Sequence, residues 1–372
     1  MNPITPPAML GILGGGQLGR YFVMAARTMG YGTIVLEPDP QAPAGRVADE
    51  HLVAAYDDSA ALEHLASVCA VVTTEFENPP SAAMEWLAAH TVVHPSPAAV
   101  AIAQDRRREK EFLHDAGIPV APFLVIETDA HLDRGTELQY PAILKTARMG
   151  YDGKGQVSVA AHVDLASAWT QLDCQRCVLE QRLPLDGEVS VVLARDSNGQ
   201  IAIYPTAHNT HLDGILDCTV VPQDGPGADA LATRVANSLD YIGVLAVEMF
   251  VVDGQLLVNE LAPRPHNSGH WTLDAARTSQ FEQQVRAVCG VGLGDPSLTA
   301  PAAAMVNLLG DLWAEGEPDW SHVLAEPRAS LHLYGKMSAR PGRKMGHITV
   351  TASNPEEAER TARALRTSVI TR

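Results

Sequence analysis

Strand and helix patterns alternate along the first part of the chain. Apolar residues 8–13 predict a strand, a glycine turn follows, and residues 17–29 predict a helix. Residues 33–36 and Val71–Thr74 predict two further short strands, and the second of these ends at Glu75. Alternating strands and helices indicate a parallel sheet with ligands at the carboxyl ends of its strands. We therefore expect an α/β, Rossmann-like first domain.

Pro95 and Pro97 mark a boundary, after which the pattern changes. A charged helix is predicted over residues 98–116, and short turns later in the chain make several strands antiparallel neighbours. Two more helices are expected at 227–240 and 273–289. The predicted strands of this second part cover residues 142–146, 178–181, 189–194, 201–204, 245–252 and 255–259.

The last part of the chain predicts a small α+β cap. Residues 330–334 and 347–351 are expected as strands on either side of a Pro341-Gly342 turn. Asn354 can cap a final helix, with Pro355 at its first position. We expect three domains: an N-terminal α/β domain (1–97), a central α+β domain (98–297) and the C-terminal cap (298–372).

The chain is long and acidic. Its 372 residues are too many for one ordinary hydrophobic core, which agrees with several domains. The net charge of -17 argues against nucleic acid or an anionic membrane as the main partner, although a locally basic pocket can still bind an anion. No apolar run is long enough to span a membrane, and no Lys or Arg precedes Arg20, so neither a span nor a signal peptide is expected.

Cysteine usage predicts a reducing compartment. The five cysteines show no dense spacing pattern, and the C-x-x-C at Cys174 and Cys177 lacks the second pair of a zinc site. We expect structural thiols in a cytoplasmic protein.

Acidic residues on two neighbouring strands predict a metal site. Glu248 lies in one apolar strand and Asn259-Glu260 end the next, with a short turn between them that makes the strands antiparallel neighbours. Two carboxylates and an amide can bind one hard cation and leave positions open for phosphate oxygens. Arg264, His266 and Asn267 follow, so cationic and hydrogen-bonding groups lie beside the metal. This combination favours phosphoryl transfer.

The turn Gly14-x-Gly16-x-x-Gly19 follows a strand and opens a helix, and Glu37 ends the next strand. Taken alone, this pattern is the dinucleotide fingerprint and would predict NAD. A helix N-terminus with small residues can equally accept another anionic ligand or serve close packing. Gln17 lies in this turn, where it can contact such a ligand.

A second glycine-rich segment, residues 149–156, follows the strand that carries Lys145. Such a loop can fold over a triphosphate and donate backbone N–H groups, while the lysine pairs with phosphate oxygens. The spacing is not that of a Walker loop, and a plain hairpin turn is the alternative. The strand lysine before it and the two carboxylates downstream favour the phosphate interpretation.

Several weaker candidates complete the pattern. Glu180 and the residues after it resemble a hinge strand able to pair with an adenine edge, and Glu188 can hold ribose hydroxyls. His211 is polar enough to line a ligand cleft, but a single histidine is as often structural. Arg106 belongs to a run of three arginines that would usually be a solvated helix face.

Basic residues also gather in the cap. Lys336 and the run Arg340 to Lys344 supply four cations in nine residues of an otherwise acidic chain. A solvated turn is the simple alternative. The contrast with the net charge of -17 favours a phosphate-bearing partner.

Taken together, these motifs resemble ATP-grasp enzymes and, more narrowly, the 5-(carboxyamino)imidazole ribonucleotide synthetase family of purine biosynthesis. The resemblance extends from Leu10 to about Thr349. Its most specific part is the block Ala-Pro-Arg-Pro-His-Asn-Ser-Gly-His at 262–270. The other motifs lie at residues 11–20, 75–78, 150–156, 209–216, 259–261 and 340–347.

The resemblance implies an ATP-grasp architecture, with an N-terminal parallel-sheet domain, a central ATP-grasp domain and a small cap. It implies a dimer whose substrates are ATP, bicarbonate and 5-aminoimidazole ribonucleotide. ATP would phosphorylate bicarbonate to carboxyphosphate, which would release carbon dioxide beside the exocyclic amine of the ribonucleotide. The products would be a carbamate, ADP and phosphate.

The resemblance also implies individual roles. Mg²⁺ or Mn²⁺ would be held by Glu248 and Glu260, with Asn259 beside it. ATP would be bound by Arg106, Lys145, Gly150, Tyr151, Asp152, Gly153, Lys154, Gly155, Gln156, Glu180, Gln181, Arg182, Leu183, Glu188 and His211. Bicarbonate and carboxyphosphate would be held by Arg264, His266 and Asn267, with Asp152 and Lys154 as further catalytic residues and Asp152 as a candidate proton acceptor. The ribonucleotide would contact Gln17, Leu18, Glu75, Tyr151, Asp152, Lys154, Ser268, Lys336 and Arg343.

Two alternatives stay open at this point. A sister ATP-grasp ligase would use another acid, such as formate, and another phosphorylated acceptor. An NAD-dependent oxidoreductase would use the N-terminal fingerprint but would leave Glu248, Glu260 and Lys145 unexplained.

Overall fold

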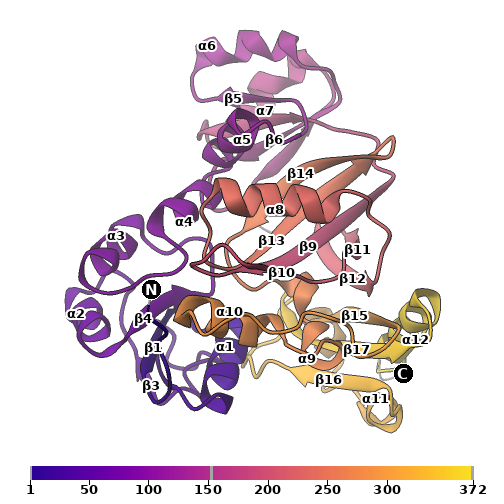
Figure 1. The fold of residues 1–372 in the computed structure, drawn as a ribbon. Helices are drawn as coiled ribbons and strands as arrows, with labels where there is room; N and C mark the ends of the chain where they lie inside the picture. The colour runs from indigo at the N-terminus through magenta and orange to yellow at the C-terminus, as the bar shows by residue number, and fades with distance from the viewer. Residues whose placement is uncertain (1, 151–153, 370–372) are drawn as a thin grey trace.

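The computed structural model describes residues 2–150 and 154–369, arranged as Figure 1 shows. A four-stranded parallel sheet with the strand order β3-β2-β1-β4 forms the N-terminal part. It confirms the α/β fold expected there from alternating strands and helices. The strands are β1 (Met9–Leu13), β2 (Gly32–Leu36), β3 (Glu50–Leu52) and β4 (Val71–Thr74), and the helices are α1 (Gln17–Thr28), α2 (Ser59–Val68) and α3 (Ser81–His90).

A nine-stranded antiparallel sheet forms the centre of the molecule. Its order is β14-β13-β9-β11-β12-β15-β17-β16, with β10 paired to β9, so β14 is an edge strand. The strands are β9 (Gly187–Arg195), β10 (Ile201–Ile203), β11 (Ala207–Leu212), β12 (Ile215–Val221), β13 (Gly243–Val252), β14 (Gln255–Ala262), β15 (Ala302–Leu309), β16 (Ala329–Leu333) and β17 (Lys344–Ala352).

A smaller antiparallel sheet stands above the central sheet in Figure 1. Its order is β5-β8-β6-β7, and it carries Lys145 on β6 and Glu180 on β8. β6 and β7 are paired neighbours, and Lys145 lies opposite Gln156 at the end where the glycine-rich segment joins the two strands. The elements are β5 (Phe123–Ile126), β6 (Ala142–Thr146), β7 (Gln156–Val159), β8 (Cys177–Gln181), α6 (Asp129–Leu132) and α7 (Leu165–Gln171).

The strands of the expected cap continue the central sheet and do not form a sheet of their own. β15 pairs with β12 on one side and with β17 on the other, and β16 closes the order. The final helix α12 (Pro355–Ser368) begins as predicted, because the side chain of Asn354 accepts the N–H of Glu357 at 2.9 Å. Arg363 and Arg366 of this helix bind the carboxylate of Asp217 on β12, which anchors the end of the chain. The domain limits at 97 and 297 remain a prediction.

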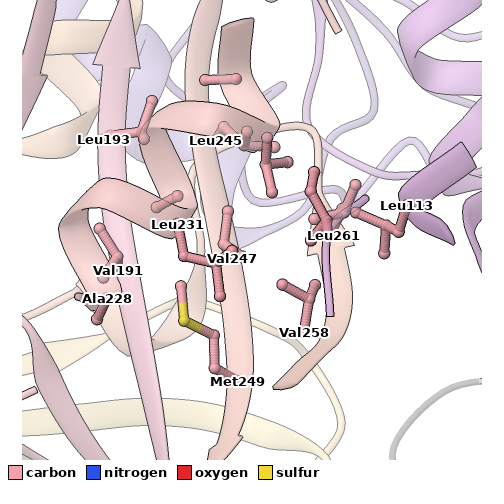
Figure 2. Close-up of a cluster of buried hydrophobic side chains, with 14 of the residues drawn as sticks. Leu113, Val191, Leu193, Ala228, Leu231, Leu245, Val247, Met249, Val258 and Leu261 are labelled. Carbon is pink, nitrogen blue, oxygen red and sulfur yellow. The ribbon is translucent and has the colours of Figure 1, made fainter. Parts of the chain in front are cut away.

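Buried apolar side chains explain which face of the central sheet is free for chemistry. Figure 2 shows Val191 of β9, Val247 and Met249 of β13, and Leu231 of α8 (Ala228–Ser238) in one cluster. Each such side chain contributes about 1.5–3 kcal/mol when fully buried. Successive side chains of a strand point to opposite faces, so Glu248, between Val247 and Met249, points away from this core.

Two helices expected as continuous are each divided in two. Residues 98–116 form α4 (Pro97–Ala103) and α5 (Arg106–Asp115), because the side chain of Asp105 accepts the N–H groups of Arg107 and Arg108 and starts a new helix. Residues 273–289 form α9 (Thr272–Ala275) and α10 (Gln280–Cys289), with Ser279 capping the second. The prediction of single helices was wrong at both places.

One short helix remains, α11 (Ser321–Ala325), which packs near β16 and α12. Among the described residues, no helix is both long and apolar enough to cross a membrane.

Candidate active site

Glu248 and Glu260 lie opposite each other on neighbouring strands. Glu248 of β13 is the register partner of Glu260 of β14. Directly opposed residues of antiparallel strands share a face, with Cβ atoms about 4.5–5.5 Å apart. Both carboxylates therefore lie on the face opposite the core of Figure 2, where a shared cation can reach them.

The surroundings of Glu248 suit a divalent cation. Burial, followed by the charge of Glu260, raises the pKa of the Glu248 carboxyl. Nε2 of His266 lies 3.3 Å from Oε1 of Glu248, and burial lowers the pKa of that imidazole well below its usual range. A neutral histidine cannot offset the charge of two neighbouring carboxylates, whereas a cation with oxygen ligands can. The donor set of Glu248, Glu260 and Asn259 fits Mg²⁺.

Arg106 joins side chains from three distant segments. It starts α5, and its guanidinium bonds both carboxylate oxygens of Glu180 on β8. Its Nη2 also donates to Oδ1 of Asn259 at 2.9 Å, and its Nη1 lies 3.6 Å from Glu260. The side chain is only 13% exposed, so Arg106 is not part of the solvated helix face that a run of three arginines would usually form. The new helix start at Asp105 turns this residue inward.

Glu180 is surrounded by cations. Its Oε2 accepts from Nζ of Lys145 at 3.3 Å and lies 3.8 Å from Nζ of Lys110. Burial alone would raise the pKa of Glu180, but Arg106, Lys110 and Lys145 outweigh it and hold that pKa well below its usual value. The carboxylate therefore stays ionised and fixes Arg106 and Lys145 between the small sheet and the central sheet.

His211 of β11 extends the site toward Glu188 of β9. Nδ1 of His211 lies 3.1 Å from Oε2 of Glu188. Burial opposes protonation of the imidazole, but Glu188, and then Glu248 and Glu260, raise its pKa. His211 is thus within electrostatic reach of the carboxylate pair.

Arg264 and Asn267 hold buried polar atoms without protein partners. Arg264 pairs with Glu77 through Nη2, yet its Nε has no hydrogen-bond partner. Both amide atoms of Asn267 are also unpartnered, although the residue is only 6% exposed. Buried polar atoms are normally hydrogen-bonded, so these groups fit a small polar ligand beside the metal site.

The glycine turn before α1 is filled by a carboxylate. The backbone N–H groups of Gly16 and Gly19 donate to the side chain of Glu75, and a Cβ on Gly16 would lie 2.6 Å from Oε1 of Glu75. Glu37 accepts from the hydroxyl of Tyr56 at 2.6 Å. A dinucleotide would need the helix N-terminus for its pyrophosphate and the acidic residue for its ribose. Both are engaged, which argues against NAD.

Lys336 and Arg343 lie in the loop between β16 and β17. Nζ of Lys336 donates to the carbonyl oxygen of Lys344 at 2.6 Å, and Arg343 donates to a carbonyl oxygen in the same loop at 2.8 Å. Arg20 of α1 reaches the carbonyl oxygen of Tyr334 at 3.3 Å. The basic loop is thereby held against the helix whose first residue is Gln17.

Some expected site residues lie apart from these contacts. Tyr151, Asp152 and Gly153 are outside the described residues, so their roles stay predictions. Lys154, Gly155 and Gln156 lead from the loop into β7. Gln181, Arg182 and Leu183 follow Glu180 but do not join the charged network in the described contacts; the amide of Gln181 bonds Gln139 at 3.3 Å.

Leu18 and Ser268 are buried side chains with internal contacts. Leu18 packs with Tyr21, Phe281 and Tyr334. The hydroxyl of Ser268 is bonded to Ser190 at 3.0 Å and to Nδ1 of His266 at 2.9 Å. Ser268 therefore orients the His266 ring, and its expected contact with the ribonucleotide remains a prediction.

A second group of possible metal ligands lies where the N-terminal part meets the C-terminal strands. Asp274, His332 and His347 bring one ligand atom each within 4.8 Å of one another. The rings of His332 and His347 stack at 4.5 Å between centroids with 13° between their planes. Stacked imidazoles do not direct their lone pairs to a common point, so this group packs the interface.

The structure adds residues that the sequence did not single out. Lys110 is fully buried beside Glu180, and Glu77 pairs with Arg264. Lys110 stands four residues after Arg106, on the same helix face, which is the signal that could have identified it. For Glu77 the signal was its place in the motif after β4.

Comparison with known proteins identifies the family. Residues 8–104 match the ribonucleotide synthetase preATP-grasp domain, residues 111–281 the ATP-grasp domain, and residues 303–361 the phosphoribosylaminoimidazole carboxylase C-terminal domain. The chain is 44% identical over 362 residues to N5-carboxyaminoimidazole ribonucleotide synthase of Bacillus subtilis, covering 95% of this chain and 94% of the relative.

Solved structures agree over nearly the whole chain. The N5-carboxyaminoimidazole ribonucleotide synthetase from Thermus thermophilus matches with a TM-score of 0.90 and 40% identity, covering 98% of this chain and 99% of that one. The N5-carboxyaminoimidazole synthase from Aspergillus clavatus in complex with ADP and 5-aminoimidazole ribonucleotide matches with a TM-score of 0.86 and 30% identity, covering 97% and 98%. Neither the formate-using ligase nor the oxidoreductase is favoured by these matches. The chain belongs to the N5-carboxyaminoimidazole ribonucleotide synthase family, built on the ATP-grasp fold.

Proposed function

We propose that this enzyme uses ATP and bicarbonate to carboxylate the exocyclic amine of 5-aminoimidazole ribonucleotide. The observation that carries the proposal is the opposed pair Glu248 and Glu260 beside Arg264 and the unpartnered amide of Asn267. That arrangement combines cation ligands with donors for a small anion, in a chain of this family. It supplies what transfer of a phosphoryl group to bicarbonate requires.

The chemistry proceeds in two stages. An oxygen of bicarbonate attacks the γ-phosphorus of ATP, the bond to ADP breaks, and carboxyphosphate forms. Carboxyphosphate then breaks its C–O bond to release phosphate and carbon dioxide. The amine nitrogen attacks the carbon dioxide, loses one proton and gives the carbamate.

Each charged group has a task in these stages. Arg106 and Lys145, fixed by Glu180, neutralise the ATP phosphates, and Arg264, His266 and Asn267 hold bicarbonate. Glu248 and Glu260 would bind Mg²⁺, which supplies charge stabilisation on the phosphate oxygens. Glu188 on β9 and His211 on β11 lie on the next two strands of the sheet after β13 and would line the nucleotide cleft.

The ribonucleotide would lie between the N-terminal sheet and the basic loop. Lys336 and Arg343 carry positive charge in a chain of net charge -17, and Arg20 links their loop to α1. Gln17 begins α1, and Glu75 follows β4 with its carboxylate bonded to the N–H groups of Gly16 and Gly19. Both residues thus lie at the carboxyl end of the parallel sheet, where such sheets bind ligands. The phosphate of the ribonucleotide would bind the loop cations.

Release of ADP tests the function directly. We would measure it with and without 5-aminoimidazole ribonucleotide, and with and without bicarbonate in buffer depleted of carbon dioxide. ADP release that needs the ribonucleotide and rises with bicarbonate supports the proposal. Release that ignores both would move the activity to another acid and another amine.

Two further parts of the proposal concern the oligomeric state and the cellular location. A homodimer is expected from the family resemblance, and sedimentation at several protein concentrations would test it. A cytoplasmic location is expected from the free thiols, which include four buried cysteines.

A further inference from the structure

The strand that carries Asn259 and Glu260 is irregular at these two residues. The register of β13 and β14 passes from Glu248 opposite Glu260 to Met249 opposite Val258, so Asn259 is an extra residue on β14. Such a bulge leaves ladder groups unpaired and changes the direction of nearby side chains, and bulges are common beside active sites. Because β14 is also an edge strand, its outer backbone groups need partners from elsewhere.

Lys110 of α5 supplies partners on one side of Glu260. Its Nζ donates to the carbonyl oxygen of Asn259 at 2.8 Å and to that of Val258 at 3.3 Å. The side chain is completely buried, which is rare for lysine and requires paired surroundings. The ammonium also lies 3.8 Å from Glu180, so one buried cation links the bulge to the carboxylate that fixes Arg106 and Lys145.

Glu109, the preceding residue of the same helix, supplies a partner on the other side of Glu260. Its Oε1 accepts the backbone N–H of Leu261 at 2.6 Å, and the residue is 2% exposed. Lys110 and Glu109 thus bind β14 immediately before and immediately after Glu260. The backbone on both sides of Glu260 is therefore bonded to two adjacent residues of α5.

We propose that Lys110 and Glu109 are positioning residues that hold the bulge of β14, so that the side chains of Asn259 and Glu260 point toward the bound cation and nucleotide. The inference rests on the proposed function, because it concerns the same site. Neither residue touches the reacting atoms. They act through the backbone of β14 and, for Lys110, through Glu180.

The test compares isosteric variants. Lys110→Met removes the donors and keeps most of the volume. Glu109→Leu removes the acceptor for Leu261, whereas Glu109→Gln keeps an oxygen for it. Arg108→Met is the matched control, because Arg108 is an exposed cation of the same helix.

Hydrogen exchange gives a readout that needs neither metal nor substrate. We expect the amides of residues 255–262 to exchange about tenfold faster in Lys110→Met and Glu109→Leu, since local opening follows lost backbone partners. Glu109→Gln and Arg108→Met should exchange like the wild-type enzyme.

Kinetics separate a positioning role from a merely structural one. The Mg²⁺ concentration for half-maximal rate should rise about 10-fold to 100-fold in Lys110→Met and Glu109→Leu, the range typical of groups that orient metal ligands. The KM for ATP should rise with it, while the KM for the ribonucleotide stays within about twofold, because the basic loop is distant from α5.

Several outcomes would overturn the proposal. Wild-type exchange and Mg²⁺ dependence in Lys110→Met would do so, as would faster exchange with unchanged Mg²⁺ dependence. If Lys110→Met does not fold, the two Glu109 variants decide. Equal hydrogen exchange and equal Mg²⁺ dependence in Glu109→Leu and Glu109→Gln would refute the positioning role. If the wild-type enzyme itself lacks ribonucleotide-dependent ADP release, the proposed function fails, while the exchange difference still tests whether these residues hold β14.

Discussion

Glu248 and Glu260 face each other across two antiparallel strands, next to a bulge at Asn259. The strand pairing places two carboxylates on one face, and burial raises the pKa of Glu248 above its ordinary value. Two neighbouring carboxylates repel each other, and a folded protein keeps that arrangement only where a positive charge offsets the repulsion. The pair therefore gives the sharpest way to test the site.

Replacing Glu260 with Gln should abolish turnover. The amide removes one negative ligand of the proposed cation, and even outer groups that orient metal ligands cost about 10-fold to 100-fold, so we expect a loss of more than about 100-fold in kcat/KM. ADP release measures it. Glu85→Gln, an exposed change on α3, is the control. A normal rate in Glu260→Gln would refute the metal assignment.

Replacing Arg343 with Ala should weaken binding of the ribonucleotide far more than binding of ATP. A charge-assisted contact with a phosphate is worth roughly 1.5–3 kcal/mol, which corresponds to a rise of about 10-fold to 100-fold in KM. Initial rates against each substrate measure the two constants. Arg360→Ala removes an equal charge from the exposed side of α12. Equal effects on both substrates would mean that the basic loop does not bind the ribonucleotide phosphate.

Replacing Asn267 with Ala should reduce the use of bicarbonate with little effect on stability. Its amide atoms are buried and have no protein partner, so truncation breaks no internal hydrogen bond. We expect the apparent KM for bicarbonate to rise about tenfold, as for one lost hydrogen bond to an anion. Thermal unfolding and bicarbonate titration test the two parts. A large fall in Tm together with normal bicarbonate dependence would assign Asn267 a structural role.

Replacing Asp217 with Asn should loosen the C-terminal helix. Burial alone would raise the pKa of the Asp217 carboxyl, but Arg366 and Arg363 outweigh it and hold that pKa below its usual value of 3.8. We expect a loss of about 1–3 kcal/mol in the free energy of unfolding at neutral pH. Urea unfolding followed by the fluorescence of Trp313 and Trp320 measures it, because both pack on the apolar cluster that includes Ala358 and Ala362 of α12.

The pH dependence of this loss has a definite sign. Because the folded pKa of Asp217 is depressed, its stabilisation is fully present above the unfolded value of 3.8 and is lost as the pH falls through the folded pKa. The difference between wild type and Asp217→Asn should therefore be constant from about pH 6 to 8 and shrink below about pH 4. Asp57→Asn, an exposed change, should show no difference. A difference that persists in acid would contradict the ion-pair explanation.

Local patterns in the sequence were enough to predict much of the architecture. The strand β6 was predicted with its observed bounds, and Asn354 correctly marked the start of α12. The turn before Gln255 made Glu248 and Glu260 neighbours in advance, because a tight hairpin determines which residues of its two strands can meet. Each of these features depends on residues close together in the chain.

Other features depend on residues that are far apart in the chain. A run of three arginines such as the one that holds Arg106 usually forms a solvated helix face, but the helix start at Asp105 turns Arg106 toward Glu180 and Asn259. Lys110, one helical turn after Arg106, was not singled out from the sequence, and only the structure shows that it is buried against β14. The cap strands joined the central sheet because β15 could pair with β12, and such a pairing is not visible in local periodicity.

The sequence by itself thus determined the elements, the carboxylate pair and, through its motifs, the family. The tertiary structure decided which charges are buried together, which polar atoms lack partners and which helix holds the irregular strand. The physical reason is that periodicity and turn chemistry act over a few residues. Burial and charge pairing depend instead on which distant strands and helices lie next to one another in space.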